Sequence, residues 1–166
     1  MRFSLTVAGT NDAPAVSALL EASYPALLRP DYSAEILAAA LPLLTRANPS
    51  LLASGTFYVA QADSQIVGCG GWSFERPGSG EVVAGLGHIR HFATHPDWTR
   101  IGVGRALLSR CIQEATISGL DVLHCQSTLS AQEFYRRQGF VPLKTAHVAL
   151  APNVVLAAVL MTLRLR

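Results

Sequence analysis

The chain has 166 residues, of which 50% are hydrophobic and 14% are charged, and its formal net charge at pH 7 is +2. This length predicts a single domain over residues 1–166 with a sizeable core. The small net charge and the lack of a basic stripe argue against a nucleic-acid-binding platform. The N-terminal apolar stretch is too short for a signal peptide and the apolar C-terminus falls short of a membrane span, so no membrane partner is expected.

The N-terminal half is typical of a strand, two helices and a hairpin. The second helix is opened by Asp31 or Ser33 and ends or kinks near Pro42. The hairpin turns at Asp63-Ser64. The expected elements are a strand over 2–8, a helix over 15–22, a helix over 31–44 and two strands within 55–75.

The C-terminal half continues with a strand, a long helix, a strand, a short helix and two final strands. The long helix begins at Gly102 and carries one apolar stripe, Val103, Leu107, Cys111 and Ala115. Ser130 to Glu133 matches a capping box that opens the short helix. The expected ranges are a strand over 84–95, a helix over 102–119, a strand over 120–127, a helix over 130–139 and strands over 140–150 and 153–165. This order predicts a mixed α/β domain.

The three cysteines and a group of three histidines are candidates for reactive or metal-binding chemistry. Cys69, Cys111 and Cys125 lack the paired spacing of disulfides and zinc sites, so each is expected to be a buried hydrophobe in a reducing cytoplasm, with a nucleophile as the alternative. His88, His91 and His95 lie on one expected strand, whose alternation puts His88 and His91 on opposite faces. No carboxylate completes a ligand set, so no metal is expected.

The junction before the long helix has the composition of an anion site. A helix begins with N–H groups that lack partners and with a partial positive charge. Gly102 and Gly104 remove side chains that would keep a ligand away from these donors, and Arg100 and Arg105 add charge. The pattern favours a phosphate or pyrophosphate, with a plain strand-to-helix turn as the alternative. It is neither a P-loop nor a Rossmann fingerprint, in which Leu107 would be Gly or Ala.

The stretch 92–108, "FATHPDWTRIGVGRALL", resembles the acetyl-coenzyme A binding segment of the GCN5-related N-acetyltransferases (GNAT). Downstream, "SAQEFYRRQGF" at 130–140 is similar to the second signature of that family. The resemblance implies the GNAT fold, a mixed and mostly antiparallel sheet of six to seven strands flanked by about four helices. Two departures are Thr99, where the family usually has Arg or Gln, and Thr128, where it often has Asn.

The resemblance implies acetyl-CoA as the cosubstrate. Backbone N–H groups near the helix start would hold the pyrophosphate, the strand edge would pair with the pantetheine arm, and the N–H of Phe92 would polarise the thioester carbonyl. The implied cofactor-binding residues are Phe92, Ala93, Thr94, Thr99, Arg100, Ile101, Gly102, Val103, Gly104, Arg105, Thr128, Ala131 and Phe134.

The resemblance also places Tyr135 at the general-acid position, with a core aromatic as the alternative. The general base is expected among carboxylates or imidazoles. His88 has a similar placement to bases of some family members, and its unperturbed pKa near ~6.5 would suit proton acceptance, with a structural histidine on a strand as the alternative. Glu81 is its main rival and Glu75 another.

The expected function is transfer of an acetyl group to a primary amine: a small molecule, an amino-acid-like compound or a peptide N-terminus. The segment 23–44, where the acceptor would enter, has few carboxylates, which argues against a polyamine or aminoglycoside. A non-catalytic acyl-CoA sensor and an empty scaffold are the alternatives. The apolar strand that includes Leu156 and Leu165 either pairs across the two-fold axis of a homodimer or is buried within the sheet.

Overall fold

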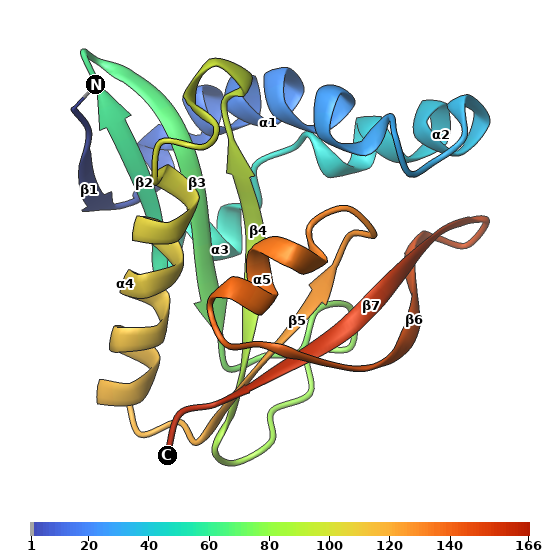
Figure 1. The fold of residues 1–166 in the computed structure, drawn as a ribbon. Coiled ribbons are helices and arrows are strands. Elements are labelled where there is room, and N and C mark those ends of the chain that lie inside the picture. Colours follow the sequence, from blue (N-terminus) through green and yellow to red (C-terminus); the bar gives the residue numbers. More distant parts are fainter. Residues whose placement is uncertain (1) are drawn as a thin grey trace.

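A computed structural model describes residues 2–166 as a seven-stranded sheet with the strand order β1-β2-β3-β4-β5-β7-β6 (Figure 1). Neighbouring strands are antiparallel, except that β4 and β5 are parallel. The strands are β1 (Ser4–Val7), β2 (Phe57–Ala62), β3 (Gln65–Ser73), β4 (Leu86–Thr94), β5 (Val122–Ser127), β6 (Val141–Ala151) and β7 (Val154–Arg164). The helices are α1 (Ala13–Leu28), α2 (Ala34–Leu44), α3 (Pro49–Ala53), α4 (Val103–Ile117) and α5 (Gln132–Arg137).

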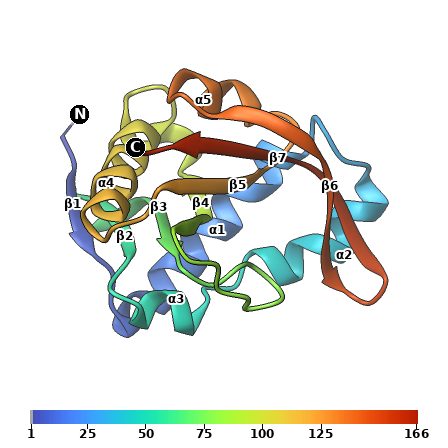
Figure 2. The same cartoon turned by 90° about the horizontal axis from the view of Figure 1, so that it is seen from below.

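Helices cover both faces of the sheet. Figure 2 shows α4 and α5 above the strands and α1 and α3 below them, with α2 beside the β6–β7 hairpin. One core cluster lies under α4 and includes Trp72, Leu107 and Leu123. A second lies under α1 and α3 and includes Leu20 and Phe57.

Helix α4 forms as its apolar period predicts. All four residues of the stripe from Val103 to Ala115 are at most 1% exposed. A Cβ on Gly68 of β3 would lie 2.5 Å from the Cγ1 of Val103, so this glycine lets the first turn of α4 approach the sheet. Gly119, with a φ of +88°, ends the helix in the left-handed conformation expected of a C-terminal glycine.

Helix α1 is longer than the sequence predicts, whereas α2 ends near Pro42 as expected. Helix α1 continues through Pro25, and α2 continues through Pro42 to Leu44. A proline deprives the carbonyl four residues earlier of its partner. Those carbonyls belong to the exposed residues Glu21 and Ala38, where water can bind them. Ser33 caps α2 as expected, by accepting a hydrogen bond from the N–H of Ile36 at 3.2 Å.

Helix α3 is not predicted by the sequence analysis. Asn48 caps it by accepting from the N–H groups of Ser50 and Leu51, and Pro49 opens it. By length and composition alone, the stretch Ala34–Ala53 would pass for a membrane-crossing helix. The cap at Asn48 instead divides this stretch between α2 and α3.

In the C-terminal half, the start of α5 differs from the expected one, and β7 lies inside the sheet. The expected capping box is wrong, because α5 begins after Ala131, whose position has no side-chain cap, and the Ser130 hydroxyl lies 3.5 Å from the carbonyl of Leu27. Strand β7 is paired on both sides, with β5 and with β6. Of its side chains, Leu156, Ala158 and Met161 are buried, whereas Val155 is 44% exposed.

Candidate active site

Strands β4 and β5 separate part-way along their length, and this opening is the centre of the site. Their pairing runs from Leu86↔Val122 to His88↔His124, after which the strands diverge (Figure 1). The divergence coincides with a bulge: His91 has a φ of +54°, and the pairing of β3 with β4 shifts between Cys69 and Gly71. Because of the bulge, the end of β4 turns one backbone edge away from β5.

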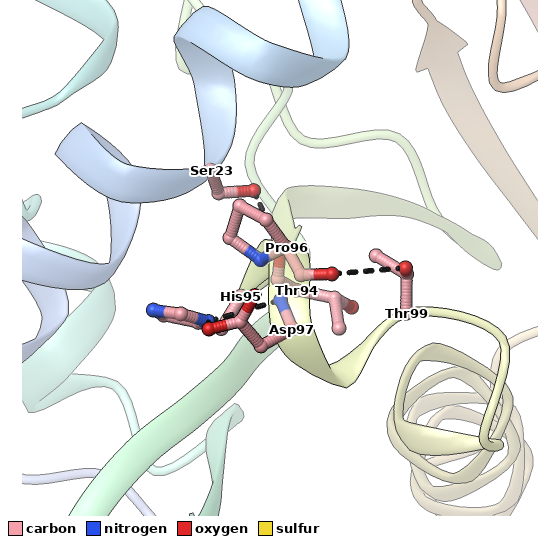
Figure 3. Close-up of polar contacts among 6 residues, drawn as sticks. All are labelled: Ser23, Thr94, His95, Pro96, Asp97 and Thr99. Atoms are coloured by element: carbon pink, nitrogen blue, oxygen red, sulfur yellow. Dashed lines mark hydrogen bonds and ion pairs between the residues drawn. The ribbon is translucent and has the colours of Figure 1, made fainter.

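Two hydroxyl groups of α1 mark that free edge. The Ser23 hydroxyl donates to the carbonyl of Thr94 at 2.8 Å (Figure 3), and the Tyr24 hydroxyl donates to the carbonyl of Phe92 at 3.0 Å. A carbonyl oxygen has two lone pairs, so each can accept a second hydrogen bond. The edge at Phe92 and Thr94 can therefore pair with an extended ligand.

The start of α4 presents backbone donors. Gly102, the N-cap, has a φ of +96° and supplies no side-chain cap, and the first helical bond is from the N–H of Ala106 to the carbonyl of Gly102 at 2.9 Å. The N–H groups of Val103, Gly104 and Arg105 thus precede the first intrahelical bond. Such donors, with the helix dipole, attract an anion.

The turn that leads into α4 is held by its own side chains (Figure 3). His95 Nδ1 accepts from the N–H of Asp97 at 3.2 Å, and the Thr99 hydroxyl donates to the carbonyl of Pro96 at 3.1 Å. Arg100 follows with a φ of +63°. The Thr99 hydroxyl therefore serves the turn, and the backbone reversal at Arg100 directs the next N–H groups along the helix axis.

The predicted cofactor residues differ in what their side chains do. Arg100, Ile101 and Arg105 are exposed, so the two guanidinium groups can reach a ligand at the helix start. Val103 is 1% exposed and packs in the core, so only its backbone faces the site. Ala93 is also buried, on the α1 side of the sheet.

Gly104 joins the two sequence motifs. A Cβ at this position would lie 3.3 Å from the ring of Phe134 and 3.6 Å from the Oγ1 of Thr94. The start of α4, the end of β4 and helix α5 are thus in contact at one point. Nearby, the carbonyl of Thr128 accepts from the N–H of Ala131 at 3.2 Å, which holds the turn before α5. The structure therefore brings together the predicted residues of 92–105 and 128–134.

Tyr135 lies on α5 between two other rings. It is 7% exposed, with ring centroids 5.1 Å from Phe134 and 5.5 Å from Phe140. Burial raises the pKa of its phenol well above the usual value, with a smaller contribution from Cys125 and other neighbours. The phenol is therefore protonated at neutral pH and can act as a hydrogen-bond or proton donor.

His88 lies at the wall of a cleft of about 460 Å³, whose lining includes His124, Arg76, Glu81 and Lys144. It is 6% exposed, and its Nε2 has no partner among the described residues. Burial, followed by the charges of His124, Arg76 and Arg90, lowers the pKa of His88 to about 4. The pKa of His88 thus lies below the unperturbed value near ~6.5, because the imidazole is buried among cationic neighbours. At neutral pH, His88 is uncharged.

The two carboxylates that rival His88 as the general base, Glu81 and Glu75, have different surroundings from it. Glu81 forms an ion pair with Arg76 at 3.8 Å at the rim of the cleft, where its side chain is 59% exposed. The contact that Glu75 makes is through its backbone: its carbonyl accepts a hydrogen bond from the hydroxyl of Ser73 at 2.7 Å. His88 is the only one of these three with an enclosed ionisable atom in the cleft wall, among residues 2–166.

His91 is placed otherwise than strand alternation predicts. The bulge turns its ring to the α1–α2 side, where Nε2 lies 3.0 Å from the carbonyl of Leu44 and the ring centroid 5.9 Å from that of Tyr24. His88 faces the same side of the sheet. It pairs with Ser73 on β3, and Ser73 lies two residues beyond Gly71, so these two positions of β3 share one face of the sheet. Among residues 2–166, no cluster of His, Cys, Asp and Glu could hold a metal ion.

Three polar residues of the site, Ser23, Tyr24 and His124, are missed by the sequence analysis as functional candidates, and Cys69 is considered there only as a buried hydrophobe or a nucleophile. Their partners are 22 or more residues away along the chain or across a strand pair. No local motif marks such contacts. Only the register of β3, β4 and β5, with the docking of α1, brings them together.

The model of the GNAT acetyltransferase domain matches residues 53–142, more than half of the chain. The chain belongs to this GNAT acetyltransferase family. The matched range contains β2 to α5, and with them the free edge of β4, the start of α4 and Tyr135. The expected family, fold and class of enzyme, an acetyl-CoA-dependent N-acetyltransferase, are confirmed.

Solved structures of other GNAT proteins share the fold of this acetyltransferase. The PaiA N-acetyltransferase of Thermoplasma acidophilum, in complex with coenzyme A, is 15% identical with a TM-score of 0.74, and the match covers 99% of each chain. A GCN5-related N-acetyltransferase of Rhodopseudomonas palustris is 24% identical with a TM-score of 0.74, covering 98% of this chain and 97% of that one. The ribosomal-protein-S18-alanine N-acetyltransferase of Escherichia coli is 18% identical with a TM-score of 0.66, covering 99% and 94%. No curated protein matches the chain in sequence.

Proposed function

We propose that the protein transfers the acetyl group of acetyl-CoA to a primary amine that binds in the cleft beside His88, with Tyr135 as the general acid. The observation that supports this most is the contact at Gly104. There the free edge of β4, the uncapped start of α4 and the helix that carries Tyr135 meet at one point. A cosubstrate with a diphosphate at one end and a thioester at the other needs these groups in one line.

The residues present fit acetyl-CoA. The N–H groups of Val103, Gly104 and Arg105 suit a pyrophosphate, and the exposed Arg100 and Arg105 add positive charge. The edge of β4 at Phe92 and Thr94 suits the amide groups of a pantetheine arm. Acetyl-CoA supplies an acetyl thioester, whose carbonyl oxygen gains negative charge and whose sulfur leaves as a thiolate when an amine attacks. The N–H of Phe92 would donate a hydrogen bond to that oxygen.

Tyr135 would stabilise the departing sulfur as a hydrogen-bond donor. Its raised pKa keeps the phenol protonated across the physiological range, and a thiol is a stronger acid than this phenol. The phenol would therefore act as the general acid by donating a hydrogen bond that strengthens as charge builds up on the sulfur, and the sulfur would leave as a hydrogen-bonded thiolate. The apolar rings of Phe134 and Phe140 exclude water from this contact.

His88 would receive the acceptor amine. Its neutral imidazole has a free Nε2 in the cleft wall, which can accept a hydrogen bond from the N–H of an uncharged amine. The cationic neighbours that lower the pKa of His88 disfavour a bound ammonium for the same electrostatic reason. The site would therefore select the deprotonated amine, and His88 would accept its proton only as the new amide bond forms.

The charges of the cleft favour an acceptor that also carries a carboxylate. Arg76 and Lys144 both line it, whereas its one carboxylate, Glu81, already faces Arg76. An amino acid or a peptide with an acidic side chain fits this balance better than a polyamine does. The three free, buried thiols suit a reducing compartment, and we place the protein in the cytoplasm on that ground.

Thiol release with acetyl-CoA and a panel of amines tests the proposal. Replacing Tyr135 with Phe should lower kcat by about 10²-fold or more, the usual contribution of a general acid, and leave the Kd of CoA unchanged. If the wild-type protein binds CoA tightly but acetylates none of the amines in the panel, the non-catalytic sensor would be favoured. Loss of CoA binding in the wild-type protein would contradict both.

A further inference from the structure

Phe92, the residue whose N–H we assign to the thioester carbonyl, lies between two peptide groups that are each held by a side chain. The group before it is held by Cys69, whose Sγ donates to the carbonyl of His91 at 3.4 Å. The group after it is held by Tyr24, whose hydroxyl donates to the carbonyl of Phe92 at 3.0 Å. The two donors come from β3 and α1, so separate elements fix the backbone on both sides of Phe92.

The geometry of a trans peptide makes the first of these contacts decisive. In a planar trans peptide, the C=O of His91 and the N–H of Phe92 point in opposite directions. A donor on the carbonyl of His91 therefore sets the direction of the N–H of Phe92. Hydrogen bonding to the carbonyl also polarises the N–H of the same group, which makes it a better donor.

Cys69 is suited to act as a permanent donor. It is 0% exposed, and burial raises the pKa of its thiol to about 12, although a hydrogen bond from the Ala93 backbone opposes the shift. The thiol thus keeps its proton at every physiological pH. Cys111, an equally buried thiol on α4, makes no side-chain hydrogen bond to another described residue and provides a comparison within the same chain.

The peptide group that Cys69 holds is one that would otherwise relax. His91 has a φ of +54°, a left-handed conformation that is unfavourable for a residue with a side chain. Its ring is held at the carbonyl of Leu44, the last residue of α2, at 3.0 Å. The strained residue is thus tied at its side chain by α2 and at its carbonyl by Cys69.

We propose that Cys69 is a positioning residue, whose hydrogen bond to the carbonyl of His91 aims the N–H of Phe92 into the opening between β4 and β5. The proposal rests on the acetyltransferase function proposed above. It assigns a role in the reaction to a buried cysteine that touches neither substrate. The thiol does not react; it acts through one peptide group.

The test compares Cys69→Ala, Cys69→Ser and Cys111→Ala in the full chain. Cys69→Ala should lower kcat by about tenfold, less than the 10²–10³-fold loss of a whole oxyanion donor, with the Kd of CoA within twofold of wild type. Cys69→Ser keeps a donor and should recover most of kcat. Cys111→Ala should lower the Tm to a similar extent without changing kcat. An unchanged kcat in Cys69→Ala, or equal losses of kcat in Cys69→Ala and Cys111→Ala, would overturn the proposal.

A second measurement does not depend on turnover. The amide resonance of Phe92 in the ¹H–¹⁵N NMR spectrum reports the hydrogen bonding and direction of its N–H. It should shift in Cys69→Ala and remain near the wild-type position in Cys111→Ala. An unshifted Phe92 resonance in Cys69→Ala would refute the positioning role, even if the wild-type protein proved to acetylate none of the amines tested. A shifted resonance in an inactive wild-type background would leave the contact supported and refute the acetyltransferase proposal alone.

Discussion

The imidazole of His88 faces that of His124 across the parallel pairing of β4 and β5, with ring centroids 6.0 Å apart. Burial comes first among the causes that lower the pKa of both rings, and each also lies near Arg76. Protonating either ring would place a cation beside its neighbour in the wall of the cleft. The pair therefore adds no positive charge to the cleft wall at physiological pH and offers imidazole nitrogens as acceptors.

The low pKa of His88 predicts how stability depends on pH. In the unfolded chain His88 takes up a proton near pH ~6.5, whereas in the folded protein it does so only near pH 4. Between these values the unfolded chain binds more protons, so stability should be complete above pH ~6.5 and fall as the pH is lowered towards 4. Thermal unfolding of His88→Gln should show a shallower loss of Tm over this window than wild type. Parallel curves for the two proteins would contradict the assigned pKa.

Gly104 should be required for CoA binding more than for folding. A valine there would push against the ring of Phe134 and the Oγ1 of Thr94, since even a Cβ lies within 3.6 Å of both. We expect the Kd of CoA, measured by calorimetry, to rise by about tenfold or more, roughly 1.4 kcal/mol. Gly9→Val is the matched control for Gly104→Val, because a Cβ at Gly9 meets nothing within 4 Å. Equal affinities for CoA would show that the contact at Gly104 is not part of the site.

Gly70 and Phe92 should be energetically coupled. A Cβ on Gly70 would lie 2.5 Å from the ring of Phe92, so Gly70→Ala should overpack this point and lower the free energy of unfolding by about 1–3 kcal/mol. In the double variant with Phe92→Ala the added methyl group finds room. Chemical denaturation should therefore give a double-mutant cycle that departs from additivity by at least about 0.5 kcal/mol. Additive losses would mean that the ring does not depend on this glycine.

Lys144 should favour acceptors that carry a carboxylate. It lines the cleft with Arg76 and is exposed on β6, so Lys144→Glu should raise KM for acidic amines by about threefold to tenfold and leave neutral amines little affected. Arg2→Glu makes the same charge change at an exposed position outside the cleft lining. The effect should weaken at high ionic strength, because Lys144 is in contact with solvent. Equal changes for acidic and neutral amines would contradict this assignment.

Local patterns determined most of the elements and the anion-binding turn. The stripe of α4, the turn at Asp63-Ser64 and the glycine at 119 each depend on residues a few positions apart, and all three form as expected. Helix α3 was missed because only five residues separate its cap from its end. The capping box predicted at Ser130 does not form, because α5 begins one residue later than the box requires and the Ser130 side chain faces α1 instead. Propensity describes what a segment can form, and packing decides where it starts.

The sequence alone determined the order of strands and helices and the glycine turn before α4, since each follows from neighbouring residues, and the family resemblance of the sequence pointed to Tyr135 as a candidate acid. Only the tertiary structure decided the state of His88 and the roles of Tyr24 and Cys69. The pKa of an imidazole depends on burial and on charges from other strands, and the hydrogen bonds around Phe92 join residues 22 to 68 positions apart. Such contacts exist only after β3, β4 and α1 have packed together, because no local motif brings the side chains within reach of one another.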